Sequence, residues 1–480
     1  MLYKISPKIP PANSAASPGD NGSRGNPPPL SREWFGHPRG LYVLAGTELW
    51  ERISFNAMQA LLVLYMVGQV LLPGHLEHVA GIGALRSFIE RLTGPLSAQS
   101  LALQVFGLYI GLVSFTPLFG GLLGDRVLGR RFAVALGALL MTAGHFCMAF
   151  ERSFLLALLL LILGAGFLRG NLASQMGQLY PPADHRRAAA FQLYYIVINC
   201  ASFLAPLIAG EIWKLYGWQA GFAFAGAGML CGLLIYLSGQ RDLPPNRGRS
   251  VLKRNPLQAG ERRIVWLLVM MVPLFATFWV AQSQVWNTYN LWARDHVNLS
   301  VYGWAVQVPW LRALDNLAAV ILVPPILWLW RRQGLRGQEP DELRKLACGC
   351  LIFGIALMWL VTGCSVIGPA AKLPLLWVVI FHLCANIGWI YFAPTAVTLF
   401  TRAAPAAVNS TMVGVCYLSI FVGSTVSGRL GALYEHYTAA KFWLIHAAIV
   451  SAGGLLLMLL APWLRRELPL QPLPQAASAR

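Results

Sequence analysis

The chain has 480 residues, of which 56% are hydrophobic and only 12% are charged, and its mean hydropathy is +0.56. This composition excludes an ordinary soluble globular domain and is typical of a protein that crosses a membrane many times. The net charge of +18 does not indicate nucleic-acid binding, because the basic residues gather in short segments between apolar stretches. The positive-inside rule places such segments in the cytoplasm. We therefore expect a lipid bilayer as partner, no nucleic acid, and cytoplasmic N- and C-termini.

The first 38 residues are polar and contain the run Pro27–Pro29, which predicts a disordered cytosolic tail at 1–38. Twelve apolar stretches long enough to span a bilayer follow this tail. They lie near 41–69, 98–123, 131–150, 153–178, 188–211, 217–238, 264–290, 304–330, 345–367, 374–399, 408–431 and 440–463. The chain is therefore predicted to be an all-α polytopic membrane protein.

A basic linker with three prolines, at 240–263, divides the twelve predicted helices into six and six. We expect an N-terminal bundle at 39–239, a C-terminal bundle at 264–465 and a cytosolic tail at 466–480. Two six-helix halves related by an axis along the membrane normal describe the major facilitator fold, whose substrate site lies near the midplane between the halves. We expect the protein to be a monomer.

The first predicted helix carries Glu48, Glu51 and Arg52 in the middle of an apolar span. One such charge near the bilayer centre costs roughly 2.5–3.5 kcal/mol on insertion scales, so these residues are functional candidates. Together with Asn56 they follow the spacing of a single helix face. That face either lines a pathway for substrate and ions or forms an internal ion pair that only fastens the helix to a neighbour.

Between the second and third predicted helices, the segment GGLLGDRVLGRR at 120–131 resembles the major facilitator signature. Its glycines allow two helices to approach closely. Asp125 can pair with arginines at neighbouring helix ends, and Arg126 and Arg130 are the candidates. We expect these three residues to form a conformational latch that a rocking motion makes and breaks.

Several segments, in the right order, resemble motifs of the proton-dependent oligopeptide transporter family. The segment ELWERISF at 48–55 is similar to the family's E-x-x-E-R-F motif in helix 1. The segment GAGFLRGN at 164–171 is similar to the helix-4 motif, and YYIVIN at 194–199 matches F-Y-x-x-I-N in helix 5. The resemblance covers the first half almost continuously and the second half patchily. It implies a transporter of small peptide-like molecules that uses the proton as coupling ion and needs no cofactor.

The chain departs from the family pattern at positions tied to coupling. The family's helix-4 lysine is Arg169 here, and an arginine cannot lose its proton. Family carboxylates in helices 7 and 10, associated with proton coupling and with the peptide's amino group, align with Ser283 and Trp389. The helix-8 asparagine aligns with Asp315. The helix pair that many bacterial members have between the halves is absent, because the linker is too short.

The remaining polar residues define the expected site. Substrate binding is assigned to Arg52, Arg169, Asn199, Gln284, Trp389 and Asn56, and proton coupling to Glu48, Glu51 and Asp315. The two arginines can each grip a carboxylate with a planar fork, and protonation of a helix-1 glutamate would release an arginine to the substrate.

Four alternatives remain open at these positions. Arg169 either takes part in a switch or is locked to Glu51. Asp315 either replaces a lost carboxylate or pairs with Arg312, three residues earlier on the same helix. Trp389 either shapes a bulkier ligand pocket or packs between helices. A lone histidine, His382, is either a packed core group or part of a proton relay.

These observations predict a secondary active transporter, a proton-coupled symporter of peptides or of peptide-like molecules that bear a carboxylate, in a bacterial inner membrane. Two alternatives are an exporter of a peptide-derived metabolite or siderophore, and a transporter-like receptor that does not move its ligand. The sequence contains no recognisable hydrolase triad, phosphate-binding loop or metal-ligand motif, so we do not expect an enzyme or a metal site.

Overall fold

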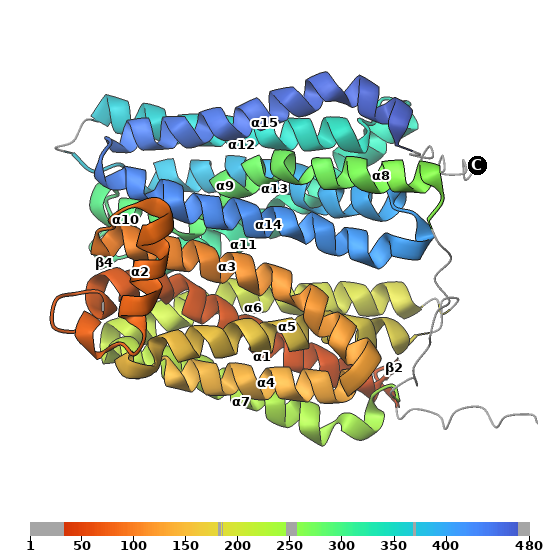
Figure 1. Ribbon diagram of the computed structural model, residues 1–480, viewed down its shortest axis with the longest axis horizontal. Coiled ribbons are helices and arrows are strands. Elements are labelled where there is room, and N and C mark those ends of the chain that lie inside the picture. Colours follow the sequence, from red (N-terminus) through yellow and green to blue (C-terminus); the bar gives the residue numbers. More distant parts are fainter. Residues whose placement is uncertain (1–32, 181–183, 185, 246–256, 368–370, 469–480) are drawn as a thin grey trace, which may run out of the picture.

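The computed structural model describes residues 33–180, 184, 186–245, 257–367 and 371–468. Most of the predicted tails at 1–38 and 466–480, and the middle of the predicted linker at 240–263, lie outside the described residues. Long helices run side by side through the molecule (Figure 1). The first helix, α1 (Arg39–Tyr65), begins at the same end of the molecule at which the last, α15 (Ala439–Glu467), ends.

Six helices form the N-terminal bundle. They are α1, α3 (Ala98–Leu123), α4 (Arg130–Cys147), α5 (Phe154–Gln178), α6 (Arg186–Tyr216) and α7 (Trp218–Ser238). Helix α1 packs between α6 and α7, α4 packs against α5 and α7, and α3 packs against α5. Small residues permit this closeness: a Cβ added at Gly120 of α3 would lie 2.1 Å from the carbonyl oxygen of Gly166 in α5. Helix α1 also contacts α5, and the charged residues described below lie on these two helices.

The C-terminal bundle repeats this plan with one broken span. Its helices are α8 (Ala259–Met270), α9 (Val272–Trp286), α10 (Thr288–His296), α11 (Val308–Leu335), α12 (Glu342–Ile367), α13 (Leu375–Ala403), α14 (Asn409–Gly431) and α15. The single predicted span at 264–290 is thus divided into α8, α9 and α10. Pro273 in the first turn of α9 explains the first break, because proline lacks the N–H that would continue α8.

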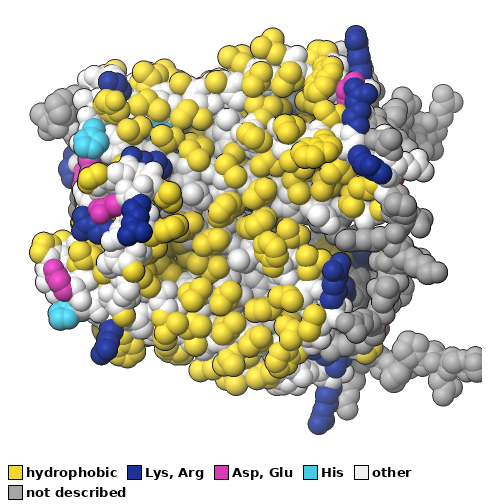
Figure 2. All heavy atoms as spheres, in the orientation of Figure 1, with side chains coloured by type: hydrophobic (Ala, Val, Ile, Leu, Met, Phe, Trp, Pro, Cys, Tyr) yellow, Lys and Arg dark blue, Asp and Glu magenta, His cyan; other side chains and the backbone are white. Residues whose placement is uncertain are grey.

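The predicted twelve-helix fold in two bundles is confirmed. Eleven helical segments of the described chain are long and apolar enough to cross a membrane. The twelfth, α4, has only 18 residues and includes Arg130, Arg131 and His145, so it is shorter and more polar than the others. Hydrophobic side chains cover the middle of the molecule, and lysines and arginines gather towards its two ends (Figure 2). This is the surface of a multi-pass integral membrane protein.

Several short elements were not predicted. Helix α2 (Ile82–Thr93) lies between the first two spans, with Ile82 and Ile89 buried. Two hairpins pair β1 (Glu33–Trp34) with β2 (His37–Pro38) and β3 (Ser300–Val301) with β4 (Trp304–Ala305). Short helical turns lie at Met66–Val70, Leu76–His78, Gly124–Leu128, Glu151–Ser153, Gln240–Asp242, Ala406–Val408 and Ala432–Glu435.

The first hairpin corrects one expectation, since residues 33–38 are ordered rather than part of a disordered tail. Its two-residue loop consists of Phe35 and Gly36, both with positive φ, which is the geometry of a tight hairpin turn. Arg186 at the start of α6 holds the hairpin by donating a hydrogen bond of 2.9 Å to Glu33. Sequence pattern did not reveal it, because each strand has only two residues.

The two bundles meet along α3 and α14 and along α6 and α11. A Cβ added at Gly107 of α3 would lie 2.4 Å from the carbonyl oxygen of Ser424 in α14, so only glycine permits this approach. Asn287 donates a hydrogen bond of 3.0 Å from the C-terminal bundle to the carbonyl oxygen of Leu103 in α3. Between these contacts, side chains of both bundles face a shared pocket.

Candidate functional site

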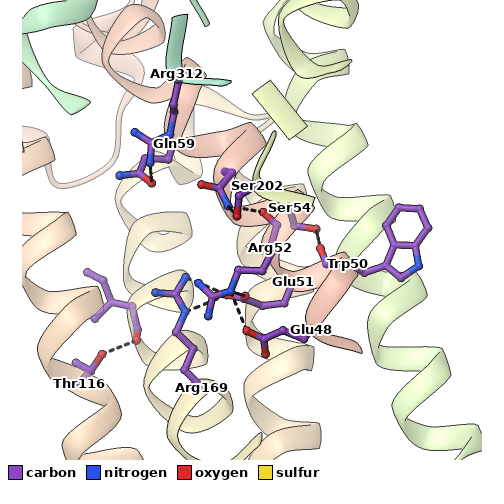
Figure 3. Close-up of polar contacts among 12 residues, drawn as sticks. Glu48, Trp50, Glu51, Arg52, Ser54, Gln59, Thr116, Arg169, Ser202 and Arg312 are labelled. Carbon is purple, nitrogen blue, oxygen red and sulfur yellow. Dashed lines mark hydrogen bonds and ion pairs between the residues drawn. The ribbon is translucent and has the colours of Figure 1, made fainter. Parts of the chain in front are cut away.

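The charged residues of α1 form one compact cluster with Arg169 of α5 (Figure 3). Arg52 places its Nε 2.8 Å from a Glu48 carboxylate oxygen and 3.2 Å from one of Glu51. On the other side of Glu51, Arg169 places its Nη2 2.9 Å from the second carboxylate oxygen. Glu51 is thus held between two guanidinium groups, as the spacing on helix 1 and the helix-4 motif had allowed.

The cluster contains two negative and two positive charges, and it is largely removed from solvent. The side chain of Glu51 is 0% exposed and that of Glu48 is 4% exposed. The guanidinium of Arg169 also lies 4.0 Å from the ring centre of Phe55, a favourable cation–π contact. Both arginines are therefore already engaged by carboxylates. A ligand carboxylate can bind them only if a glutamate is displaced or neutralised.

Two residues near this cluster escaped the sequence analysis. His145 of α4 is fully buried, and neither of its ring nitrogens has a hydrogen-bond partner among the described residues. It lies close enough to Glu51 to interact with its charge. Tyr194 of α6 lies beside Glu48 in the same way. The sequence offered one signal for each residue. His145 is a lone histidine within a predicted span, and Tyr194 is the first tyrosine of the helix-5 motif.

A second group of residues lines a pocket of about 130 Å³ between the bundles, with walls from α6, α9, α11 and α13. Its lining includes Asn199, Trp286, Arg312, Asp315, Asn386 and Trp389. The structure thus brings together three residues that the sequence assigned to the site, Asn199, Asp315 and Trp389. Trp389 lines this pocket. The position that aligns with the family's helix-10 carboxylate therefore contributes an aromatic side chain to the pocket wall.

Asp315 does not pair with Arg312, so that alternative from the sequence is wrong. Its carboxylate turns towards α13 and lies 2.6 Å from Nδ1 of His382. Asn386 donates a second hydrogen bond to the same oxygen, at 3.2 Å. The other ring nitrogen of His382 lies 2.9 Å from the hydroxyl of Tyr289. Three titratable groups therefore form a continuous chain from the pocket wall into the C-terminal bundle.

Asn56 and Gln284 lie away from the pocket lining. Asn56 is buried and donates hydrogen bonds to the carbonyl oxygen of Arg52, at 2.8 Å, and to the hydroxyl of Ser202 in α6, at 3.2 Å. Gln284 is 0% exposed and donates a 2.8 Å hydrogen bond to the carbonyl oxygen of Ser427 in α14. Both amides fasten helices to each other in this structure, and their assignment to substrate binding stays a prediction.

The expected latch residues lie where α3 gives way to α4. Nε of Arg130 lies 2.5 Å from a carboxylate oxygen of Asp125. Gly129, with φ of 79°, makes the sharp turn that brings these two residues together. The side chain of Arg126 is exposed. The pair joins two helices of the same bundle, and its role as a latch stays a prediction.

Comparisons with known proteins identify the family and the fold. A model described as "POT family" matches residues 131–251 and 249–449. The chain is 26% identical to the "Uncharacterized transporter YclF" of Bacillus subtilis, over 91% of this chain and 96% of that one. It is 25% identical to the "Peptide transporter YePEPT" of Yersinia enterocolitica, over 90% and 96%. A crystal structure of "peptide transporter POT in complex with sulfate" superimposes with a TM-score of 0.77 at 26% identity, covering 91% of this chain and 97% of that one.

Proposed function

Because this chain belongs to the POT family of transporters, we propose that it is a proton-coupled symporter of peptides or of peptide-like molecules that bear a carboxylate. It works by alternating access, as a monomer, in a bacterial inner membrane with both termini in the cytoplasm. The likeness to YePEPT, itself named a peptide transporter, supports the substrate class. The observation that carries the proposal is the position of Glu51 between Arg52 and Arg169.

The cluster offers a physical route from proton binding to substrate binding. While Glu51 is ionised, it occupies one face of Arg52 and of Arg169. When it takes up a proton, both arginines keep their charge, and the low-dielectric surroundings make an unpaired buried cation expensive. A substrate carboxylate that enters at this moment restores neutrality. Proton and substrate then travel together, and loss of the proton returns the arginines to Glu51.

The groups around Glu51 decide how readily it takes up a proton. Arg52 faces it from its own helix and Arg169 faces it from α5, and both favour the carboxylate. Burial favours the protonated form. His145 on α4 is a further group that lies close enough to Glu51 to interact with its charge. We assign the proton-coupling role on α1 to Glu51, with Glu48 holding Arg52 in place.

Asp315 is the second proton-coupling residue in this proposal. It lies on the pocket wall and forms a hydrogen-bonded chain with His382 and Tyr289. Arg312, on the same helix, is a cation that lines the same pocket. A proton that enters from the pocket can be shared between the Asp315 carboxylate and the His382 ring. This pair supplies titratable groups in a bundle where Ser283 and Trp389 stand in place of the family carboxylates.

The test is uptake of labelled dialanine and trialanine into proteoliposomes under an inward proton gradient. We expect accumulation above equilibrium, its loss in Arg52→Ala, and retained binding without pH-driven accumulation in Glu51→Gln. Glu211→Gln is the matched control, because Glu211 forms an exposed ion pair with Lys214 outside the cluster. Binding of these peptides without transport would indicate a receptor. Transport driven only outwards would indicate an exporter.

A further inference from the structure

Arg312 contacts neutral side chains, whereas Arg52 and Arg169 contact carboxylates. It lies on α11, and its Nη2 donates a hydrogen bond of 2.7 Å to the side-chain oxygen of Gln59 on α1 (Figure 3). Its guanidinium carbon lies 5.5 Å from the ring centre of Trp286. Both partners are neutral. Among the described residues, Arg312 forms no ion pair and its Nε has no hydrogen-bond partner.

Sequence proximity would have paired this charge with Asp315. That carboxylate is instead held by His382 and Asn386, as described above. Arg312 therefore presents to the pocket a positive charge that forms no ion pair among the described residues, and the Asp315 carboxylate on the same helix acts on it only without direct contact. By contrast, each arginine of the α1–α5 cluster has a carboxylate within about 3 Å. A partly buried guanidinium with donors to spare is the kind of group that binds an oxyanion.

The position of Arg312 sets the size of a ligand that could reach both sites. Gln59, its partner, lies seven residues after Arg52 on α1. At about 1.5 Å per residue, Arg52 and the Gln59 position that Arg312 contacts are about 10 Å apart along α1. An extended dipeptide backbone spans about 7 Å. An acidic side chain on its first residue covers the remaining distance, while its terminal carboxylate lies at Arg52 and Arg169.

We propose that Arg312 binds an anionic group at the end of the ligand opposite its terminal carboxylate, so that the pocket favours peptides whose first residue is acidic. The inference rests on the proposed function, because it takes the terminal carboxylate to be held at the α1–α5 cluster. Asn199 and Asn386 on the pocket wall offer amide donors and acceptors to the rest of that residue. Trp286 and Trp389 line the space around it.

The test compares Glu-Ala with Gln-Ala, two peptides of nearly the same shape that differ in the charge of the first side chain. Dissociation constants are measured on the purified protein in detergent, from tryptophan fluorescence and from thermal shifts. We expect Glu-Ala to bind about tenfold more tightly than Gln-Ala, the effect of one charge-assisted contact. In Arg312→Gln the two peptides should bind equally, and Arg312→Lys should restore part of the preference.

Arg294→Gln is the matched control. Arg294 is an exposed arginine of the same bundle, paired with Asp295 and absent from the pocket lining. This variant should keep the full preference for Glu-Ala. Equal binding of the two peptides by the unaltered protein, or an unchanged preference in a folded Arg312→Gln, would overturn the inference. If Ala-Ala binds but neither acidic nor amide peptide is preferred, the inference alone fails; if none of the three binds, the proposed function fails with it.

Discussion

The two bundles carry their buried charges in different ways. In the N-terminal bundle, Glu51 is held by arginines on both sides, and the cluster around it is neutral. In the C-terminal bundle, Asp315 has a histidine rather than an arginine as its partner, and Arg312 forms no ion pair among the described residues. The first arrangement matches two carboxylates with two arginines, so any proton taken up by Glu51 leaves a positive charge for the substrate to balance. In the second arrangement, a proton sets the charge of the Asp315–His382 pair and a ligand can pair with Arg312. The two halves of one repeated fold therefore differ in chemistry.

The largest effect should come from breaking the matched cluster. Replacing Arg169 with methionine leaves Glu51 buried with only one cation, and removing one member of a buried ion pair costs about 3–5 kcal/mol. We expect transport to be lost and the thermal unfolding temperature in detergent to fall by several degrees. Arg169→Lys keeps the charge and should recover most of the stability. An Arg169→Met protein as stable as the parent would mean that the cluster is not tightly coupled.

The second-largest effect should come from Asp315 in the C-terminal bundle, whose charge we expect a proton to set. In Asp315→Asn the hydrogen bond to His382 can persist while the carboxylate charge is lost. We expect gradient-driven accumulation to fall about tenfold, a coupling free energy of 1–2 kcal/mol, while exchange of labelled for unlabelled peptide continues. The measurement is accumulation against exchange in the same vesicles at several external pH values.

A pair of histidine variants controls for this effect. His382→Gln removes the titratable partner of Asp315, whereas His446→Gln alters a buried histidine of the same bundle that contacts Gln284 instead. Only the first should reduce accumulation, and combining it with Asp315→Asn should add little, because residues of one network are not additive. Fully additive losses would show that Asp315 and His382 act separately.

The smallest effect on stability should come from Asp125→Asn. The Asp125–Arg130 pair is near the surface, with 47% and 28% of the two side chains exposed, and such pairs contribute at most about 1 kcal/mol. If the pair works as a latch, the turnover rate should change while the unfolding temperature hardly moves. A kinetic comparison of Asp125→Asn with Arg86→Gln, which alters a similarly exposed ion pair on α2, would reveal this. Identical rates would leave the pair with only a local structural role.

Much of the fold was predictable because long apolar stretches have few alternatives in a membrane. Every backbone group must be satisfied within the segment, so each stretch becomes a helix whose ends fall close to the ends of the stretch. Helix α3 occupies the predicted range 98–123 without change. The division of 264–290 into three helices was missed, since hydropathy does not register Pro273 or the break at Asn287. Helix α2, which is too short to span a bilayer, was missed for the same reason.

The composition of the charged cluster on α1 was determined by the sequence itself, because residues three and four positions apart share one face of any helix. Which partners those charges would choose was decided by tertiary structure. Glu51 meets Arg169 only because α1 and α5 pack together, and Asp315 meets His382 rather than Arg312 only because α11 lies against α13. Helical spacing limits which side chains can meet within a helix, but pairing between helices depends on their packing angle and depth, which local sequence does not encode.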